Sequence, residues 1–373
     1  MKKIGILTTY FATNFGAMLQ PFAMKRTLEN MGYEVEMIRY KQPKVYNVYE
    51  PLTWRKLPKR PTSIIRFLLD LPILKLKYKK KRYFLQYMQK HVQPKLGFIR
   101  SIPADYDYYF FGSDQIWNPK ITGGFDKVYF GEFPVKEGAK KIAYAASAED
   151  IVYDNGNIAY LRNHLEKLDH IAVRENKLAE DLRKYTGIKN IEVVVDPTML
   201  ADPSIYKEID HQNPLPGKKF VLFYKIRNCI DFLPKIYKYA QSIGAELLIL
   251  SSWYEKDIVD FCERNKDVTY LPTAGVEVFL GAIQNAECIF TPSFHGCVFP
   301  ILYHKPFFSL VLSDSWNTRA NDLLCSLGLE NRLLTINSEI INESIDFIEV
   351  DRLVAERRND SMIFVKKALG LEV

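Results

Sequence analysis

Residues 287–296 read ECIFTPSFHG, and this stretch indicates both the fold class and a candidate site. It opens with an apolar run, residues 288–291, that is typical of a buried strand and that a proline ends. The residues that follow predict a helix through Cys297 to Tyr303, so Ser293, His295 and Gly296 lie at the strand-to-helix turn. A strand, a tight turn and a helix in this order are the repeating unit of an α/β protein.

This turn brings together free backbone N–H groups, a hydroxyl and an imidazole, which is an arrangement that can bind an anion. The positive end of the helix dipole disfavours a charged imidazole, so we expect His295 to be largely neutral at pH 7 and able to accept a proton. From composition alone, a satisfied histidine beside a tight turn explains the same residues equally well.

Strand and helix patterns alternate along the whole chain of 373 residues, which predicts parallel sheets in doubly wound domains. A polar, proline-rich joint at 211–217 separates two such series. We therefore expect two Rossmann-like domains, residues 1–210 and 211–373, that face each other across a GT-B-like cleft, and the last helix (352–369) could pack back on the first domain. The predicted strands are 3–8, 34–40, 108–111, 141–145, 170–173 and 191–195, then 220–224, 246–250, 268–271, 288–291 and 307–310.

Composition describes a soluble globular protein, with 47% hydrophobic and 25% charged residues. No apolar run approaches the roughly 20 residues that span a bilayer. Five cysteines without paired spacing indicate a reducing compartment, so the expected location is the cytoplasm. The sequence has no zinc pattern, no dinucleotide fingerprint and no Walker motif, and it therefore predicts neither a metal nor a bound cofactor.

Charge is concentrated in residues 55–100, which hold 14 Lys or Arg and one acid, Asp70, a net charge of +13 in a chain of +7. Apolar residues interleave with these cations at a spacing that fits two helices with a break at Pro72. A basic amphipathic insertion of this kind often lies on an anionic membrane surface. A solvated face explains it about as well. A nucleic-acid face is disfavoured, because the apolar content is high and no nucleic-acid motif accompanies it.

Further segments place polar residues at or after predicted strand ends, where the ligands of open α/β sheets bind. Asn14 could contact a polar ligand or simply cap a helix. Asp114 and Gln115 suit a sugar hydroxyl face, although a helix cap explains Asp114 somewhat better. Arg174 and Arg319 suit a carboxylate or phosphate, although a surface pair of Arg174 with its neighbour Glu175 would also fit. The segment 196–198 is expected to form a structural turn.

These segments together resemble the polysaccharide pyruvyl transferase family. The likeness covers nearly the whole chain in the same motif order, and it rests on NFGAMLQ (14–20), GSDQIWNP (112–119), RE (174–175), DPT (196–198) and SFHG (293–296). The resemblance implies a GT-B-like fold and the transfer of a pyruvyl group from phosphoenolpyruvate to a sugar, as a ketal, during assembly of a bacterial surface polysaccharide. It also implies a sugar or lipid-linked oligosaccharide as acceptor at the cytoplasmic membrane face.

Under this resemblance His295 is the acid/base, Ser293, Gly296, Arg174 and Arg319 bind the donor, and Asn14, Asp114 and Gln115 bind the acceptor. Many members of the family carry an arginine at the position of Ser293, and that arginine is thought to bind phosphoenolpyruvate. Another cation must then take its place here, for which Arg319, Arg174, Lys225 and Arg227 are candidates. Two alternatives stay open: a GT-B-like glycosyltransferase that uses a nucleotide-sugar, and a non-catalytic sugar-binding relative.

Overall fold

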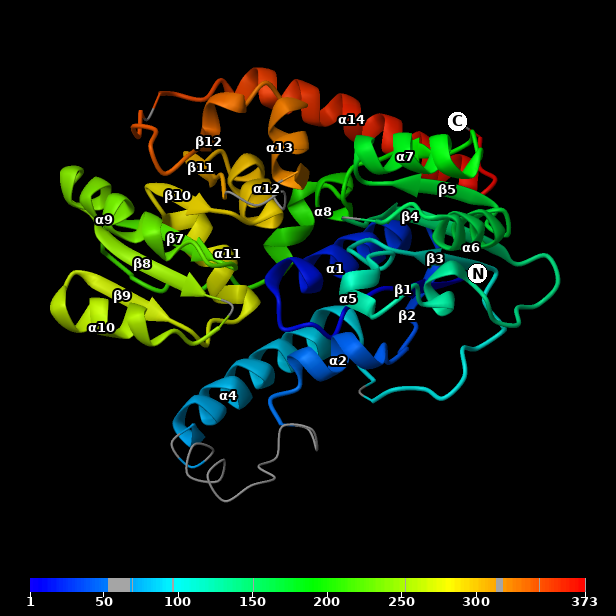
Figure 1. Ribbon diagram of the computed structural model, residues 1–373, viewed down its shortest axis with the longest axis horizontal. Coiled ribbons are helices and arrows are strands. Elements are labelled where there is room, and N and C mark those ends of the chain that lie inside the picture. Colours follow the sequence, from blue (N-terminus) through cyan, green and yellow to red (C-terminus); the bar gives the residue numbers. More distant parts are fainter. Residues whose placement is uncertain are drawn as a thin grey trace.

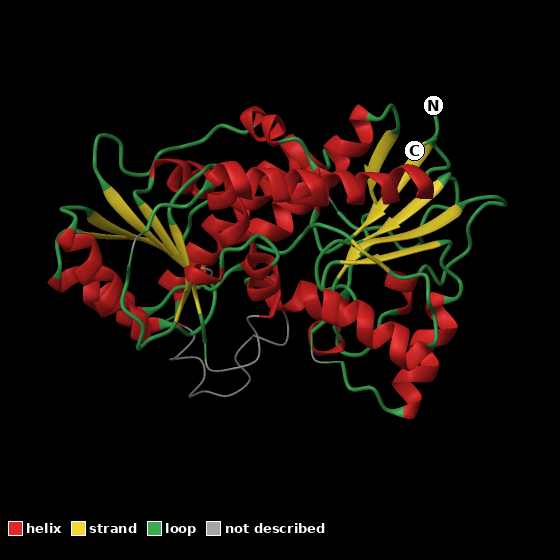
Figure 2. Cartoon of the chain, turned by 90° about the horizontal axis from the view of Figure 1, so that it is seen from above, coloured by secondary structure: helices red, strands yellow, loops and turns green. Residues whose placement is uncertain are grey.

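The structure, a computed structural model, describes residues 1–52, 68, 70–95, 97–149, 151–251, 253–312, 318–341 and 343–372. These residues form two six-stranded sheets in which all neighbouring strands pair in parallel. Figure 2 shows the two sheets at opposite ends of the molecule, with helices between them. The predicted fold class, two Rossmann-like domains with parallel sheets in a GT-B-like arrangement, is confirmed.

The first sheet has the strand order β2-β1-β3-β4-β5-β6. All four residues of β3 are buried, as expected for a central parallel strand covered on both faces. Strand β6 contains two of the five residues predicted for it. The strands are β1 (Lys3–Leu7), β2 (Glu34–Met37), β3 (Tyr108–Phe111), β4 (Lys140–Ala146), β5 (His170–Val173) and β6 (Glu192–Val193).

The second sheet has the order β12-β11-β10-β7-β8-β9. Its central strands β7 and β10 are also entirely buried. The two-residue edge strand β12 was not predicted, because so short a segment carries no detectable period. The strands are β7 (Phe220–Lys225), β8 (Glu246–Ser251), β9 (Val268–Leu271), β10 (Cys288–Thr291), β11 (Phe307–Leu310) and β12 (Leu333–Leu334).

Helices connect successive strands of both sheets (Figure 1). In the first domain they are α1 (Phe15–Asn30), α2 (Pro43–Tyr49), α4 (Leu71–Tyr87), α5 (Pro119–Thr122), α6 (Asn155–Leu165), α7 (Asn176–Thr186) and α8 (Pro197–Leu200). In the second they are α9 (Leu233–Ser242), α10 (Lys256–Arg264), α11 (Val276–Asn285), α12 (Phe294–Leu302), α13 (Thr318–Cys325) and α14 (Phe347–Ala368).

One hydrophobic core joins the two domains. Phe15, at the start of α1, stacks on Phe279 of α11 with ring centroids 4.4 Å apart, and it also contacts Tyr224 of β7 at 5.4 Å. All three rings belong to a single buried cluster that extends into both sheets. The burial of these large rings fixes the N-terminus of α1 against the second domain.

Helix α14 returns from the second domain to the first (Figure 1, red). Ser361 Oγ accepts the backbone N–H of Val195 at 2.9 Å, and the Tyr108 hydroxyl donates to the carbonyl of Leu369 at 2.9 Å. The last helix therefore contributes hydrogen bonds to the first sheet, although its sequence follows the second.

The basic segment keeps the predicted break, slightly displaced: Leu68 is helical, Asp70 lies in a turn, and α4 begins at Leu71 with Pro72 in its first turn. Most of the helix expected before the break lies outside the described residues. Phe84 and Tyr87 on α4 are buried in the shared core, so part of its apolar face packs inside the protein. Membrane contact by this segment stays a prediction. Among the described helices, none combines the length and the apolar character needed to span a bilayer.

Candidate active site

A cavity of about 200 Å³ lies between the two domains. Its walls come from loops that directly follow β1 and β3 in the first domain and β7, β8 and β10 in the second, so both sheets present strand carboxyl ends to it. Six of the residues predicted for the site line this cavity: Asn14, Asp114, Gln115, Ser293, His295 and Arg319.

The first turn of α12 presents His295 to the cavity. Ser293 caps this helix, because its Oγ accepts the N–H of Gly296 at 3.2 Å. A Cβ on Gly296 would lie 2.5 Å from Thr291 Oγ1, so the turn has no room for a side chain there. Gly296, which was predicted to bind the donor, donates its N–H to Ser293 in this structure. The observed role of Gly296 is close packing.

The N-terminus of α1 meets that of α12 at His295. Asn14 caps α1 through Oδ1, which accepts the N–H groups of Gly16 at 3.0 Å and Ala17 at 3.4 Å. Gly16 packs directly against the imidazole, because a Cβ on it would lie 2.0 Å from His295 Nδ1. Two helix N-termini from different domains therefore converge beside the histidine, and both favour negative charge there.

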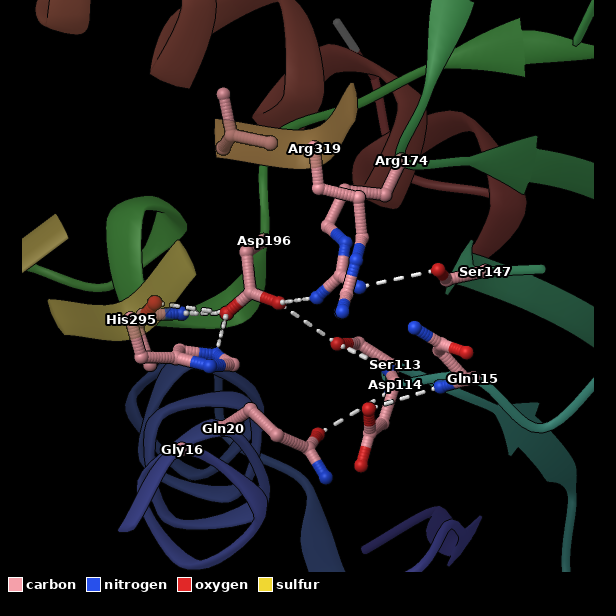
Figure 3. Close-up of polar contacts among 12 residues, drawn as sticks. Gly16, Gln20, Ser113, Asp114, Gln115, Ser147, Arg174, Asp196, His295 and Arg319 are labelled. Carbon is pink, nitrogen blue, oxygen red and sulfur yellow. Dashed lines mark hydrogen bonds and ion pairs between the residues drawn. The ribbon is translucent and has the colours of Figure 1, made fainter. Parts of the chain in front are cut away.

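Asp196 is the carboxylate partner of His295 (Figure 3). Its Oδ1 lies 3.4 Å from His295 Nε2, while Oδ2 accepts hydrogen bonds from Ser113 Oγ at 2.8 Å and from Arg174 Nη1 at 2.7 Å. The prediction of a structural turn at 196–198 is correct in part, because Asp196 also caps α8. The contact between this side chain and His295 of the second domain was not predicted.

Two opposing effects set the charge of this carboxyl group. Burial raises the pKa of Asp196, but His295, Arg174 and the Thr198 N–H outweigh it and hold the pKa well below its usual value. The ionised Asp196 lies within ion-pair distance of Nε2 and so favours this orientation of the ring. His295, which was expected to be neutral at the helix terminus, therefore faces a carboxylate that could not be predicted from the sequence.

Arg174 is bound inside the first domain. Its guanidinium is buried and donates to Asp196, to Glu175 Oε1 at 3.1 Å and to Ser147 Oγ at 3.0 Å, and it lies 4.6 Å from the ring of Phe294. Burial lowers the pKa of Arg174, but Glu175 and Asp196 raise it by more. Arg174 lines a smaller neighbouring cavity with Asp196, so its position suits holding that carboxylate better than contacting a donor.

Arg319 and Arg227 are the two candidate cations that line the cavity with His295. Arg319 Nε donates to Glu149 Oε1 at 2.6 Å, and Arg227 Nη2 lies 3.9 Å from Glu149 Oε2. Glu149 follows β4, so this ion-pair group links the domains. The fourth candidate, Lys225, is buried and bound to Glu255 at 2.5 Å. Nothing in the sequence pattern pointed to Glu149.

The segment 112–119 contributes both to the cavity and to the core. Thr9 Oγ1 donates to Asp114 Oδ2 at 2.7 Å, which holds this carboxylate at the wall that Gln115 also lines. Trp117 of the same segment lies fully buried and stacks on Phe130, so its indole belongs to the core. Among the described residues, no cluster of His, Cys, Asp or Glu has the arrangement of a metal site. A reaction without metal stays a prediction.

Several solved structures resemble this chain at low identity. A UDP-GlcNAc 2-epimerase from Methanocaldococcus jannaschii has a TM-score of 0.48 and 12% identity, covering 96% of this chain and 93% of its own. A UDP-N-acetylglucosamine 2-epimerase from Rickettsia bellii has 0.47 and 10%, covering 99% and 95%. Acinetobacter baumannii MurG has 0.42 and 11%, covering 100% and 96%.

A search of curated protein sequences returned no match. A family model described as polysaccharide pyruvyl transferase matches residues 14–314, which is most of the chain. The matched region includes the helix cap at Asn14, the segment 112–119, Asp196 and the turn that carries His295. The chain therefore belongs to the polysaccharide pyruvyl transferase family.

Proposed function

We propose that this protein transfers a pyruvyl group from phosphoenolpyruvate to two hydroxyls of a sugar in a bacterial surface polysaccharide or its lipid-linked precursor. The observation that carries the proposal is the convergence of an Asp196–His295 pair and two arginines on one interdomain cavity, in a chain of this family. The exposed cations of α4 would hold the enzyme at the cytoplasmic face of an anionic membrane.

The chemistry sets the groups that the site needs. The methylene carbon of phosphoenolpyruvate gains a proton, a sugar hydroxyl attacks C2, and the bond from C2 to the phosphate oxygen breaks. The second hydroxyl then closes the ketal. Of the two hydroxyl protons, one ends on the new methyl group and the other on the released phosphate. The reaction thus requires a proton carrier and cations for a phosphate and a carboxylate.

His295 is our choice for the proton carrier. Asp196 orients the ring through Nε2, and Arg174, Ser113 and Thr198 hold Asp196 in turn. An imidazole oriented by a buried carboxylate can give a proton to the methylene carbon and take one from a hydroxyl in the same cycle. Asp114 and Gln115 lie on the first-domain wall and would orient the acceptor sugar.

Arg319 and Arg227 take the place of the family arginine at Ser293 in this proposal. Both contact Glu149, whose carboxylate occupies in this structure the position that suits a carboxylate or phosphate of the donor. Donor binding would displace Glu149 from at least one of the two arginines. The N-termini of α1 and α12 add positive potential at the same place.

The direct test supplies the purified protein with phosphoenolpyruvate or with a panel of nucleotide-sugars, each in the presence of simple pyranosides that carry adjacent free hydroxyls. Pyruvyl transfer predicts phosphate release and an acid-labile pyranoside adduct that is heavier by one pyruvyl group. Nucleotide release without consumption of phosphoenolpyruvate would favour the glycosyltransferase alternative. Pyranoside binding without binding of phosphoenolpyruvate in calorimetry would favour a non-catalytic sugar-binding protein.

A further inference from the structure

Two further cavities adjoin the one at His295 and extend it toward α4. Tyr49 lines all three, and Trp253 lines the first and the second. The second cavity also contains Lys77 and Lys80 of α4, and the third contains Lys81 and the rings of Tyr46 and Phe98. These cavities, which share aromatic walls, form a row that leads from the histidine to the basic helix and is called the groove below. The proposed reaction at His295 uses only one end of it.

An aromatic pair marks the junction of the first two cavities. Tyr49, at the end of α2, and Trp253, after β8, come from different domains, and their rings lie nearly parallel with centroids 6.2 Å apart. Trp253 is 45% exposed, and its backbone carbonyl accepts a hydrogen bond from the Tyr270 hydroxyl at 2.7 Å. A large ring displayed to solvent from a fixed backbone is a common platform for a sugar ring, whose C–H faces pack on aromatic surfaces.

Positive charge lines the groove beyond this pair. Helix α4 carries six Lys or Arg residues and no acid. Lys80 is 94% buried, its Nζ donates to the carbonyl of Ser251 at 3.0 Å, and burial lowers its pKa to about 7. Glu50 is the acid on this wall, and Lys81 binds it at 2.6 Å. A buried cation beside a cavity is stabilised by an anion in that cavity.

We propose that this groove is an acceptor subsite for a sugar joined to a phosphate, with the sugar ring on Tyr49 and Trp253 and the phosphate on Lys77 and Lys80. The inference rests on the proposed function, because it assumes that acceptor hydroxyls react at His295. The same chemistry could come from a soluble sugar phosphate or from a sugar that a diphosphate joins to a lipid.

Calorimetry on the full chain tests this with galactose 1-phosphate, methyl galactoside, inorganic phosphate and galactosyl diphosphate-farnesol in detergent. Wild type should bind the two sugar phosphates more tightly than methyl galactoside or phosphate. Trp253→Ala should weaken that binding about tenfold, and Lys77→Gln about three- to tenfold. The matched control Lys75→Gln, an exposed α4 cation outside the three cavities, should leave it unchanged.

Comparison of the two sugar phosphates shows which kind of acceptor the subsite binds. Tighter binding of the farnesyl compound than of galactose 1-phosphate indicates a lipid-linked acceptor, and equal binding of the two indicates a soluble one. Inorganic phosphate binding as tightly as galactose 1-phosphate would overturn the subsite, and so would binding that is equal in all variants. Phosphoenolpyruvate is titrated separately into wild type. Its failure to bind would count against the proposed function alone, whereas its binding without that of either sugar phosphate would count against this subsite alone.

Discussion

Replacing Gly16 with alanine is the sharpest test of the site geometry. The new Cβ would lie 2.0 Å from Nδ1, 2.4 Å from Cγ and 2.6 Å from Cε1 of His295. Ordinary contacts begin at 3.4 Å, so the imidazole would have to withdraw by about 1.4 Å. The ring would then move away from Asp196 and from its position at the cavity wall.

A displacement of about 1 Å at a catalytic group costs on the order of 100-fold in rate. We therefore expect Gly16→Ala to lower turnover of phosphoenolpyruvate at least 100-fold, which is about 2.7 kcal/mol in the barrier. The loss should not come from unfolding. Gly16 lies in the first turn of α1, where alanine favours the helix by up to about 1 kcal/mol and offsets part of the strain.

Gly156→Ala is the matched control. Gly156 is the second residue of α6, as Gly16 is of α1, and its Cβ would meet only Asp154 Oδ1 at 3.4 Å. Turnover, thermal unfolding and phosphoenolpyruvate affinity should all stay near wild type in this variant. If Gly16→Ala kept turnover within threefold of wild type, the imidazole would not be held as described and its assignment would be wrong.

Four further predictions follow from the same contacts. His295→Ala should lower turnover about 10²- to 10⁴-fold, whereas substitution of the exposed His304 should not; a loss below threefold would exclude His295 as the acid/base. Asp196→Asn should lower turnover with little change in phosphoenolpyruvate affinity, since Asp196 contacts the histidine and not the cavity arginines. Because the pKa of Asp196 is lower in the folded protein than the usual value of 3.8, its carboxylate stabilises the fold at pH values above 3.8, and this stabilisation is lost as the pH falls below 3.8. The free energies of unfolding of wild type and D196N should therefore differ at neutral pH and converge below pH 3.8. Glu149→Gln should tighten phosphoenolpyruvate binding about fivefold, because a neutral amide competes less for Arg319; weaker binding would mean that Glu149 instead orients the arginine. Neutralising three exposed cations of α4, Lys75, Lys79 and Arg82, should weaken binding to phosphatidylglycerol vesicles at least tenfold. Unchanged binding would mean that these cations only form a solvated face.

The strands could be predicted because parallel strands buried on both faces leave continuous apolar runs, and five of them, among them β3 and β10, have the predicted bounds. The location of the site could also be predicted, because ligands of open α/β sheets bind at the carboxyl ends of strands. Asp114 and His295, which follow two such ends, line the same cavity. Contacts between the domains could not be predicted. Asp196 and His295 are far apart in sequence, and their contact depends on how two separately patterned domains dock.

Helix α4 shows a second limit, because its pattern has two physical solutions. Basic residues interleaved with apolar ones are typical of a helix on a membrane, and the same spacing serves a helix whose apolar side packs in a protein core. Lys80 and Phe84 turn inward here, while Lys77 and Lys79 stay exposed. Only the position of the second domain decides which cations are buried, and a sequence pattern does not contain that position.

The site itself depends on domain docking, and this links the packing to the chemistry. His295, the proposed acid/base, lies on the second domain, and its carboxylate partner Asp196 lies on the first. Arg227 and Arg319 lie on the second domain, and Glu149, which contacts both, lies on the first. Phe15 stacks on Phe279 in the shared core and fixes α1, whose Gly16 packs against His295. A change that weakens this core should therefore lower turnover more than it lowers stability, because small domain movements separate the reacting groups before the fold is lost.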